Sequence, residues 1–187
     1  MTTSATFETG ALTRSEIINC VAHLRAFAIL LTGDRECADG LVRDTVVRTL
    51  AVTNGQTTVI RLRVRMFAGL RKLHYAARRR SISARQPESH SINKRGLESD
   101  GRLRIFGRLH DEQREALILT VASGLSHEQA AEVCNCEIDT IKSRVRDAWR
   151  EISRMLREAS PEQQIDHFEM LAEKRTFKLV TDHVYAV

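Results

Sequence analysis

Residues 124–156 read GLSHEQAAEVCNCEIDTIKSRVRDAWREISRML and predict two short amphipathic helices joined by a tight turn. Ser126 and Gln129 have the spacing of a capping box, so the first helix is expected to begin there. Asn135 lies between the two helices, and Asn tolerates the left-handed backbone that a tight reversal needs. From residue 138 onward, apolar residues recur at helical spacing and leave a polar, basic outer face. The combination predicts a helix-turn-helix that reads DNA.

In a helix-turn-helix, the N-terminal part of the second helix enters the major groove. The residues that we expect to contact bases or phosphates lie on or beside its outer face: Thr140, Lys142, Ser143, Arg144, Arg146, Asp147 and Arg150. Arg144 lies toward the buried edge, where it contacts either a phosphate or its own domain. The alternative is an ordinary solvated helical face, but cap, turn and preceding helix occur together here and favour DNA reading.

Composition favours a small all-α protein. The 187 residues are 42% hydrophobic but only 5% aromatic and include two prolines, which fits two small helical domains. No uninterrupted apolar run approaches the roughly 20 residues that span a bilayer, and residues 1–10 lack the apolar core of a secretion signal. We therefore expect a cytoplasmic protein that does not bind a membrane.

The four cysteines do not have the spacing of a disulfide framework, which favours reduced thiols. Cys134, Cys136 and His127 lie close together in sequence, but a second well-spaced ligand pair is missing. Isolated His and Asp residues do not assemble a nucleophile with a base. The sequence therefore predicts neither metal nor cofactor, no small-molecule substrate and no enzyme.

Positive charge is concentrated in one stretch. Residues 61–80 contain no acid, whereas the whole chain has a net charge of only +5, so the remainder is slightly acidic. This stretch contains eight basic residues: Arg61, Arg63, Arg65, Arg71, Lys72, Arg78, Arg79 and Arg80. Its apolar side, from Leu62 to Ala77, is expected to be buried and to leave the arginines mostly exposed. Such a surface is expected to bind a polyanion in a salt-sensitive manner.

The pattern along the chain divides it into four parts. Residues 11–80 contain three amphipathic segments and form the first predicted domain. Residues 81–101 are rich in Ser, Gly and charge, and are predicted to be a flexible linker. Residues 102–159 form the second domain, in which a helix starting at Asp111 is expected to bury Ala116, Leu117, Val121 and Ala122. Residues 160–187 are not assigned.

Together these features resemble the extracytoplasmic-function group of sigma-70 type RNA polymerase sigma factors. Residues 111–150, DEQREALILTVASGLSHEQAAEVCNCEIDTIKSRVRDAWR, resemble region 4 of that group. Residues 24–50, LRAFAILLTGDRECADGLVRDTVVRTL, resemble regions 2.1 and 2.2, and residues 62–80 take the place of regions 2.3 and 2.4. The resemblance is closest to the alphaproteobacterial general-stress-response type. It implies binding to the β′ and β subunits of core polymerase, promoter DNA, an anti-sigma factor and a response regulator that mimics sigma, and it makes the paired cysteines structural.

The resemblance also implies a role for each surface. Docking on the polymerase falls to Asp39, Leu41, Val42, Arg43 and Asp44. An unstacked base of the minus-10 element is held by Asn54, Gln56 and Thr57, and its backbone by Arg71, Lys72, Arg78, Arg79 and Arg80. The minus-35 element is read by the helix-turn-helix residues, chiefly Lys142, Ser143 and Arg146.

Several positions depart from the family pattern, among them Gly40, Arg65 and Asp147. They motivate one alternative, a sigma-like decoy that binds an anti-sigma factor and has little promoter activity. A second alternative is a conventional regulator that uses only the helix-turn-helix, which predicts a stable dimer and palindromic half-sites.

Overall fold

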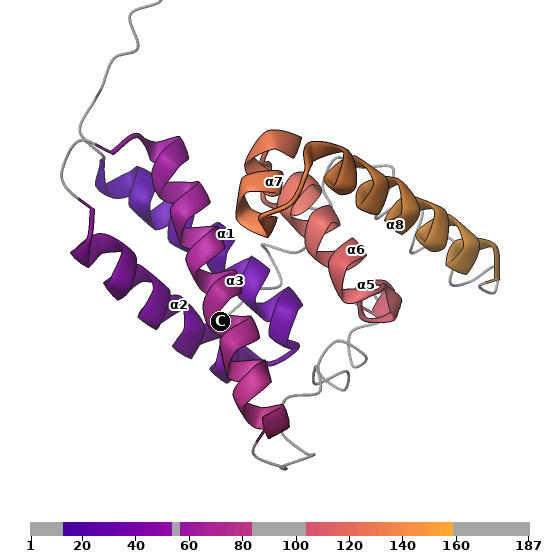
Figure 1. Ribbon diagram of the computed structural model, residues 1–187, viewed down its shortest axis with the longest axis horizontal. Coiled ribbons are helices and arrows are strands. Elements are labelled where there is room, and N and C mark those ends of the chain that lie inside the picture. Colours follow the sequence, from indigo (N-terminus) through magenta and orange to yellow (C-terminus); the bar gives the residue numbers. More distant parts are fainter. Residues whose placement is uncertain (1–12, 54–56, 84–103, 159–187) are drawn as a thin grey trace, which may run out of the picture.

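The computed structural model describes residues 13–53, 57–83 and 104–158, and every regular element within these ranges is a helix (Figure 1). The N-terminal domain contains α1 (Arg14–Thr32), α2 (Arg35–Ala51) and α3 (Val59–Ser83). The C-terminal domain contains α5 (Arg104–Arg108), α6 (Asp111–Leu117), the π-helical η1 (Ile118–Ala122), α7 (His127–Cys134) and α8 (Ile138–Glu158). The predicted all-α class is confirmed.

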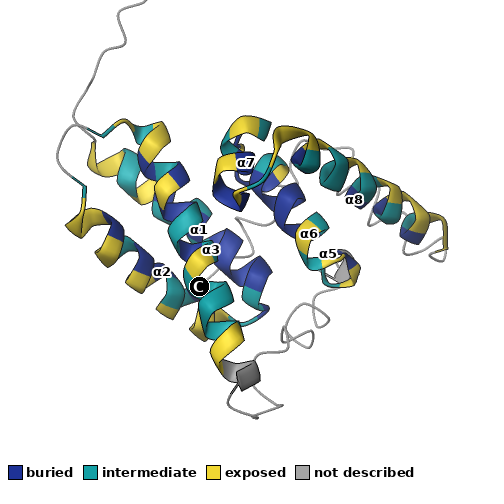
Figure 2. Ribbon diagram, viewed as in Figure 1, coloured by how far each residue is buried: buried dark blue, intermediate teal, exposed yellow. Residues whose placement is uncertain are grey.

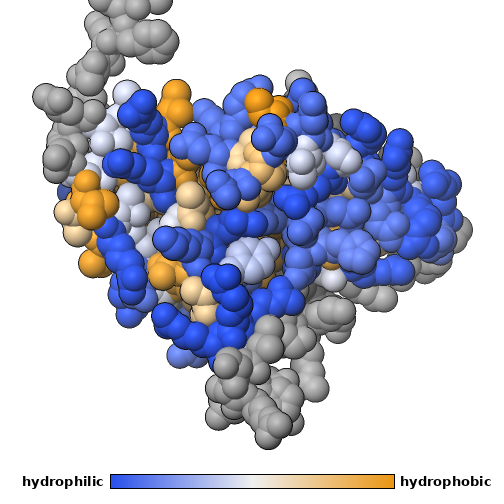
Figure 3. Space-filling view, in the orientation of Figure 1, coloured by the Kyte–Doolittle hydropathy of each residue, from blue (hydrophilic) through white to orange (hydrophobic). Residues whose placement is uncertain are grey.

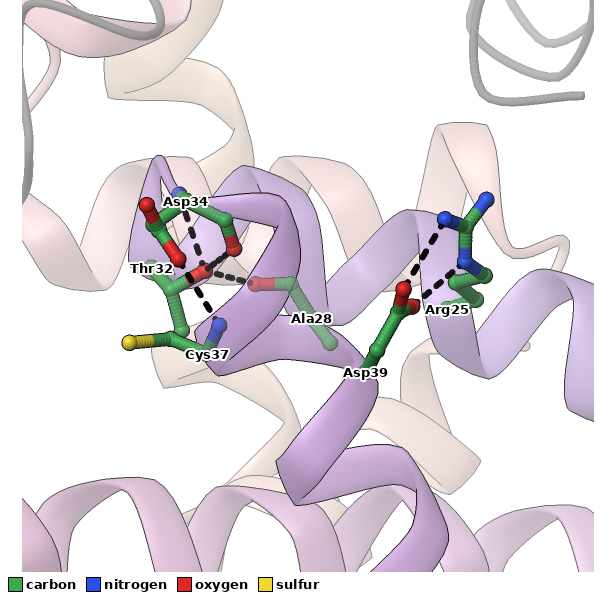
Figure 4. Close-up of polar contacts among 6 residues, drawn as sticks. All are labelled: Arg25, Ala28, Thr32, Asp34, Cys37 and Asp39. Carbon is green, nitrogen blue, oxygen red and sulfur yellow. Dashed lines mark hydrogen bonds and ion pairs between the residues drawn. The ribbon is translucent and has the colours of Figure 1, made fainter. Parts of the chain in front are cut away.

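Local capping explains where the first two helices begin and end. Thr13 and Glu16 form the capping box that starts α1, and Gly33 ends it in the left-handed conformation with φ 70°. Asp34 then caps α2 by accepting a hydrogen bond from the backbone N–H of Cys37 at 2.7 Å (Figure 4). These signals reverse the chain within two residues and place α2 against α1.

An ion pair joins α1 to α2 beyond this turn. Arg25 donates from Nε to Oδ1 of Asp39 at 2.6 Å and from Nη2 to Oδ2 at 3.2 Å (Figure 4). The two parallel hydrogen bonds fix the guanidinium and carboxylate in one geometry. Because the Asp39 side chain is 46% exposed, solvent screens the pair, and it aligns the helices more than it stabilises them.

The core of the N-terminal domain lies between α1 and α3, with α2 covering one side (Figure 1). Phe27 of α1 and Phe67 of α3 are fully buried, with ring centroids 5.2 Å apart. By length and composition α1 could cross a membrane, but here its apolar residues form this core, as in many globular proteins. Helices α1 and α3 are therefore held together by the burial of apolar side chains rather than by polar contacts.

The C-terminal domain departs from the predicted pattern at one place. Helix α6 continues into the π-helical turn η1, in which each turn holds more residues than an α-helical turn. The extra residue rotates the following side chains, so Val121, predicted to be buried, is 39% exposed. Ala116, Leu117 and Ala122 are buried as expected.

The two domains lie against each other in the described structure. Helix α3 packs on α1 and α2 with one side and on α7 with another, and η1 contacts α1 (Figure 1). Helix α3 also continues to Ser83, which is inside the predicted linker. The rest of that linker, and residues 160–187, lie outside the described residues.

The turn between α7 and α8 gives a test of the fold. Asn135 has φ 52° and ψ 54°, which a β-branched side chain adopts only with strain. We expect Asn135→Val to lower the free energy of unfolding by about 1–2 kcal/mol. Asn135→Gly should stay within about 0.5 kcal/mol of the original chain. Urea denaturation measures both, and equal losses would contradict the strained turn.

The Arg25–Asp39 pair predicts a dependence on pH. The Arg25 hydrogen bonds hold the pKa of Asp39 below its ordinary value of 3.8. A lowered pKa means that ionised Asp39 stabilises the domain above about pH 4 and that this contribution disappears as the pH falls further. Asp39→Asn should therefore flatten the loss of stability in acid, as measured by urea denaturation at several pH values. Asp44→Asn, an exposed position on the same helix, is the control and should leave the acid slope unchanged.

Candidate nucleic-acid interface

The helix-turn-helix has the predicted local geometry. Ser126 and Gln129 form a complete capping box at the start of α7, and Asn135 ends that helix in the left-handed conformation. Helix α8 buries one stripe consisting of Ile141, Ala148, Ile152 and Met155. Its opposite side faces solvent along its whole length (Figure 2). The fold therefore supports α8 from below and leaves Lys142, Arg146 and Arg150 exposed on its outer face.

The charges on this outer face are mostly paired along the helix. Lys142 binds Asp139 at 3.2 Å, and Arg150 binds Asp147 at 3.2 Å. Arg146 is exposed and forms no ion pair with the described residues. Exposed pairs of this kind contribute little energy, so a phosphate can displace the carboxylates. Among the described residues predicted to read DNA, Arg146 is therefore an exposed basic side chain without an ion pair.

The two remaining polar residues of this face are less exposed. Ser143 lies within 3.4 Å of Asp147, toward which its hydroxyl is directed, and Thr140 is half-buried. Asp147 thus contacts Ser143, which lies one turn before it, and Arg150, which lies three residues after it. The departure from the family pattern at this position lowers the positive charge of the reading face and orders its neighbours.

Arg144 holds the reading helix to its own domain. Its Nη2 donates to Glu112 on α6 at 2.7 Å, and Nη1 lies 3.8 Å from the sulfur of Cys136. The side chain is only 20% exposed. Of the two roles that the sequence left open for Arg144, the contact with its own domain is the one seen in the structure.

The basic face of α3 is divided between solvent and the C-terminal domain. The members that point to solvent are Arg61, Arg65, Lys72, Arg79 and Arg80. Three others, predicted to be exposed with them, are half-buried against the second domain: Arg63, Arg71 and Arg78. The basic residues are therefore mostly exposed, as expected, but the C-terminal domain covers part of the surface that they form.

Arg71 makes the most buried of these contacts. Its Nε donates to Oε1 of Glu115 at 2.7 Å, and its guanidinium lies 4.9 Å from the ring centroid of Tyr75. Burial opposes the charge of Arg71, but Glu115 outweighs this effect, and the pKa of Arg71 lies above its ordinary value. Burial also raises the pKa of Tyr75 to about 12, so its hydroxyl stays neutral at physiological pH.

Glu115 itself is fully buried. Burial raises its pKa, and Arg71 offsets only part of this effect. Glu115 and Asp111 were not predicted as partners of the basic residues of α3. One signal could have found them, namely a row of eight basic residues without a nearby acid, which needs acidic partners from elsewhere in the chain.

The predicted polymerase-docking helix is only partly available. Arg43 and Asp44 are exposed and Leu41 is half-buried, whereas Val42 is 7% exposed and packs in the core. The Val42 side chain therefore does not reach the surface in this structure, and its role in docking stays a prediction. Asp39 is held by Arg25 from α1, so it presents only part of its carboxylate.

The predicted base-holding loop is described in part. Asn54 and Gln56 lie outside the described residues, and Thr57 is half-buried at the start of the segment that leads into α3. Within the described ranges, His, Cys, Asp and Glu side chains form no group that could hold a metal. Cys134 is buried, which raises the pKa of its thiol to about 12, so it is a core residue.

The C-terminal domain matches a known protein family. The family model of sigma-70 region 4 matches residues 103–156. The curated ECF RNA polymerase sigma factor EcfG of Rhodopseudomonas palustris (strain TIE-1) is 38% identical over 152 residues, which cover 76% of this chain and 84% of that protein. The ECF RNA polymerase sigma factor SigC of Mycobacterium tuberculosis (strain CDC 1551 / Oshkosh) is 51% identical over 41 residues, 22% of each chain.

Two solved structures share the fold. The sigma factor RpoE, in complex with the anti-sigma factor NepR from Bartonella quintana, has a TM-score of 0.60 and 29% identity, and the match covers 77% of this chain and 96% of that chain. The NMR structure of the PhyRSL–NepR complex from Sphingomonas sp. Fr1 has a TM-score of 0.54 and 22% identity, covers 75% of this chain and 86% of that chain, and shows likeness of the fold alone. Because the similarity to EcfG spans most of both chains, this chain belongs to the extracytoplasmic-function (ECF) RNA polymerase sigma factors.

Proposed function

We propose that the chain acts as the promoter-reading subunit of RNA polymerase and contacts the minus-35 element with α8 and the minus-10 element with α3. The observation that carries this proposal is the pair of outward basic surfaces on the two domains, one around Arg146 and one around Lys72, Arg79 and Arg80. Membership of the ECF sigma factors supports it. As in that family, the chain acts by binding, without catalysis of its own, and works in the cytoplasm.

On the minus-35 side, α8 lies in the major groove with Arg146 at the centre of the contact. An arginine reads guanine through paired hydrogen bonds to O6 and N7. Lys142 and Arg150 exchange their helical carboxylate partners for phosphates, since those pairs are exposed. Arg144 takes part by holding α8 on α6 rather than by reading a base.

On the polymerase side, the exposed part of α2 forms the docking surface. Arg43 and Asp44 lie beside Val47, which is 63% exposed and offers an apolar contact. Apolar atoms also reach the surface elsewhere on the N-terminal domain (Figure 3). Gly40 is exposed, and a Cβ at this position would meet no atom within 4 Å, so the family departure there leaves a gap on the surface rather than in the core.

The same comparison supports a proposal on how the activity of the chain is regulated. The RpoE relative was solved bound to the anti-sigma factor NepR, at 29% identity over nearly its whole length. We propose that this chain also binds an anti-sigma factor and serves a stress response. Binding of that kind stores the sigma factor away from the polymerase until a signal releases it.

Reconstituted transcription tests the proposed function. The chain, core polymerase and a library of promoters with a stress-type minus-35 element are combined, and specific transcripts are counted. Specific initiation is expected. Core binding without transcript would instead indicate the decoy, and binding to palindromic DNA without core would indicate a conventional regulator.

Arg146 gives the sharpest test of the minus-35 assignment. Arg146→Ala should weaken binding to the preferred element by about 5- to 150-fold and relax the base preference at one position, because a paired guanine contact is lost. Arg157→Ala, at the exposed last turn of the same helix, is the matched control and should leave the preference intact. Duplex-DNA binding to a randomised minus-35 library measures both, and equal effects would reject the assignment.

A further inference from the structure

The middle of the outer face of α8 carries a carboxylate, that of Asp147, among basic and hydroxyl side chains. The side chain is 41% exposed, so it does not belong to the core of the domain. Consecutive residues of an α-helix point about 100° apart, so Asp147 and Arg146 face different parts of a groove in which the helix lies. The two side chains therefore address different base pairs.

The two oxygens of Asp147 are held differently. Oδ1 accepts a hydrogen bond from Nη1 of Arg150 at 3.2 Å, whereas Oδ2 lies 3.4 Å from the hydroxyl oxygen of Ser143. Arg150 is 72% exposed, and an exposed ion pair of this kind contributes little energy. Ser143 is half-buried, so its hydroxyl stays beside the carboxylate. The carboxylate is thus oriented on one side and loosely held on the other.

The phosphate contact proposed for Arg150 changes the surroundings of Asp147. A phosphate accepts charge-assisted hydrogen bonds from a guanidinium, as a carboxylate does, and Arg150 cannot direct Nη1 to both. The exchange therefore leaves Oδ1 of Asp147 without its donor. A carboxylate that is enclosed in an interface without a donor is costly. The DNA has to supply this donor, or else Asp147 weakens binding.

The bases differ in whether they can supply a donor in the major groove. Guanine presents the acceptors O6 and N7, and thymine presents the acceptor O4 and a methyl group, so both disfavour a carboxylate. Cytosine presents the N4 amino donor, and adenine presents its N6 amino donor beside the acceptor N7. Because N7 repels a carboxylate, cytosine is the base that fits Asp147 best.

We infer that Asp147 is a specificity-determining residue of α8 and selects a cytosine in the minus-35 element through the N4 amino group of that base. The inference rests on the proposed minus-35 role of α8. Ser143 keeps the carboxylate oriented for this contact, and Arg150 turns to the phosphate backbone. The negative charge of Asp147 lowers the general attraction of α8 for DNA and raises its selectivity at one position.

The base preference of the assembled polymerase measures this role. The full chain is combined with core polymerase and with promoters randomised in the minus-35 element, and the bound DNA is sequenced. Asp147→Asn should shift the preference at one position from cytosine to adenine, because an amide pairs with N6 and N7 of adenine. Asp147→Ala should lower the preference for cytosine at the same position by about 5- to 150-fold, without a gain for adenine.

Asp139→Asn is the matched control. Asp139 lies in the first turn of α8, is 93% exposed and pairs with Lys142, so this variant removes the same charge from the same helix. Both Asn variants should bind DNA more tightly in general, because a negative charge near the phosphates is lost. Asp139→Asn should keep the base preference of the original chain. Tight binding also shows that the variants are folded.

A modified base tests the amino group directly. 2-Pyrimidinone, which is cytosine without its amino group, replaces the selected cytosine. This change should weaken binding of the original chain by about 5- to 150-fold more than binding of Asp147→Ala, because only the original chain loses a contact. Equal losses for the two chains would overturn the inference.

The library distinguishes failure of the inference from failure of the proposed function. The inference is overturned if Asp147→Asn has the same base preference as Asp139→Asn. If Arg146→Ala changes the preference in that same experiment, the minus-35 role of α8 stands without Asp147. If the polymerase with the original chain prefers no base in the minus-35 element, the proposed function is overturned together with the inference.

Discussion

Helix α3 satisfies two opposed requirements, and the rest of the structure is arranged around it. One side carries Leu62, Met66, Phe67 and Leu70, which are fully buried and complete the core of the N-terminal domain. The other side carries a row of arginines that repel one another and need anions. Since a helix cannot turn one side without moving the other, the core packing decides which arginines face solvent and which face the C-terminal domain.

The two surfaces that we propose to contact DNA balance their positive charge in different ways. Helix α8 carries its own carboxylates, so Lys142 and Arg150 are paired within the helix and the surface has a reduced positive charge. Helix α3 has no acid in its basic stretch, and its arginines pair with acidic residues of the other domain. The charge balance of α8 is therefore independent of the other domain. The charge balance of α3 depends on where the C-terminal domain lies.

The sequence was sufficient for features fixed by local chemistry. The capping box at Ser126, the left-handed Asn135 and the buried stripe of α8 each depend on residues within one or two turns, and all are present. The π-helical turn was not foreseen, because its extra residue is set by packing and not by a local signal, and Val121 moved to the surface as a result.

Features that depend on distant residues were largely missed. Glu115 lies 44 residues from Arg71, and nothing in the sequence around it marks it as a partner. The roles predicted for individual residues in DNA and polymerase contact, including those of Lys142, Ser143, Lys72 and Arg43, stay predictions, since they depend on molecules outside this chain.

The contacts of the α3 arginines with α6 and with Ser123, which follows η1, have a consequence for how the sequence of this protein can diverge. Three contacts connect the two domains, those of Arg63 with the Ser123 carbonyl, Arg71 with Glu115 and Arg78 with Asp111, so a change in the phase of one helix has to be matched in the other. A recombinant that takes its second half from a relative will keep the compact arrangement only if that half brings acids in the same order and phase.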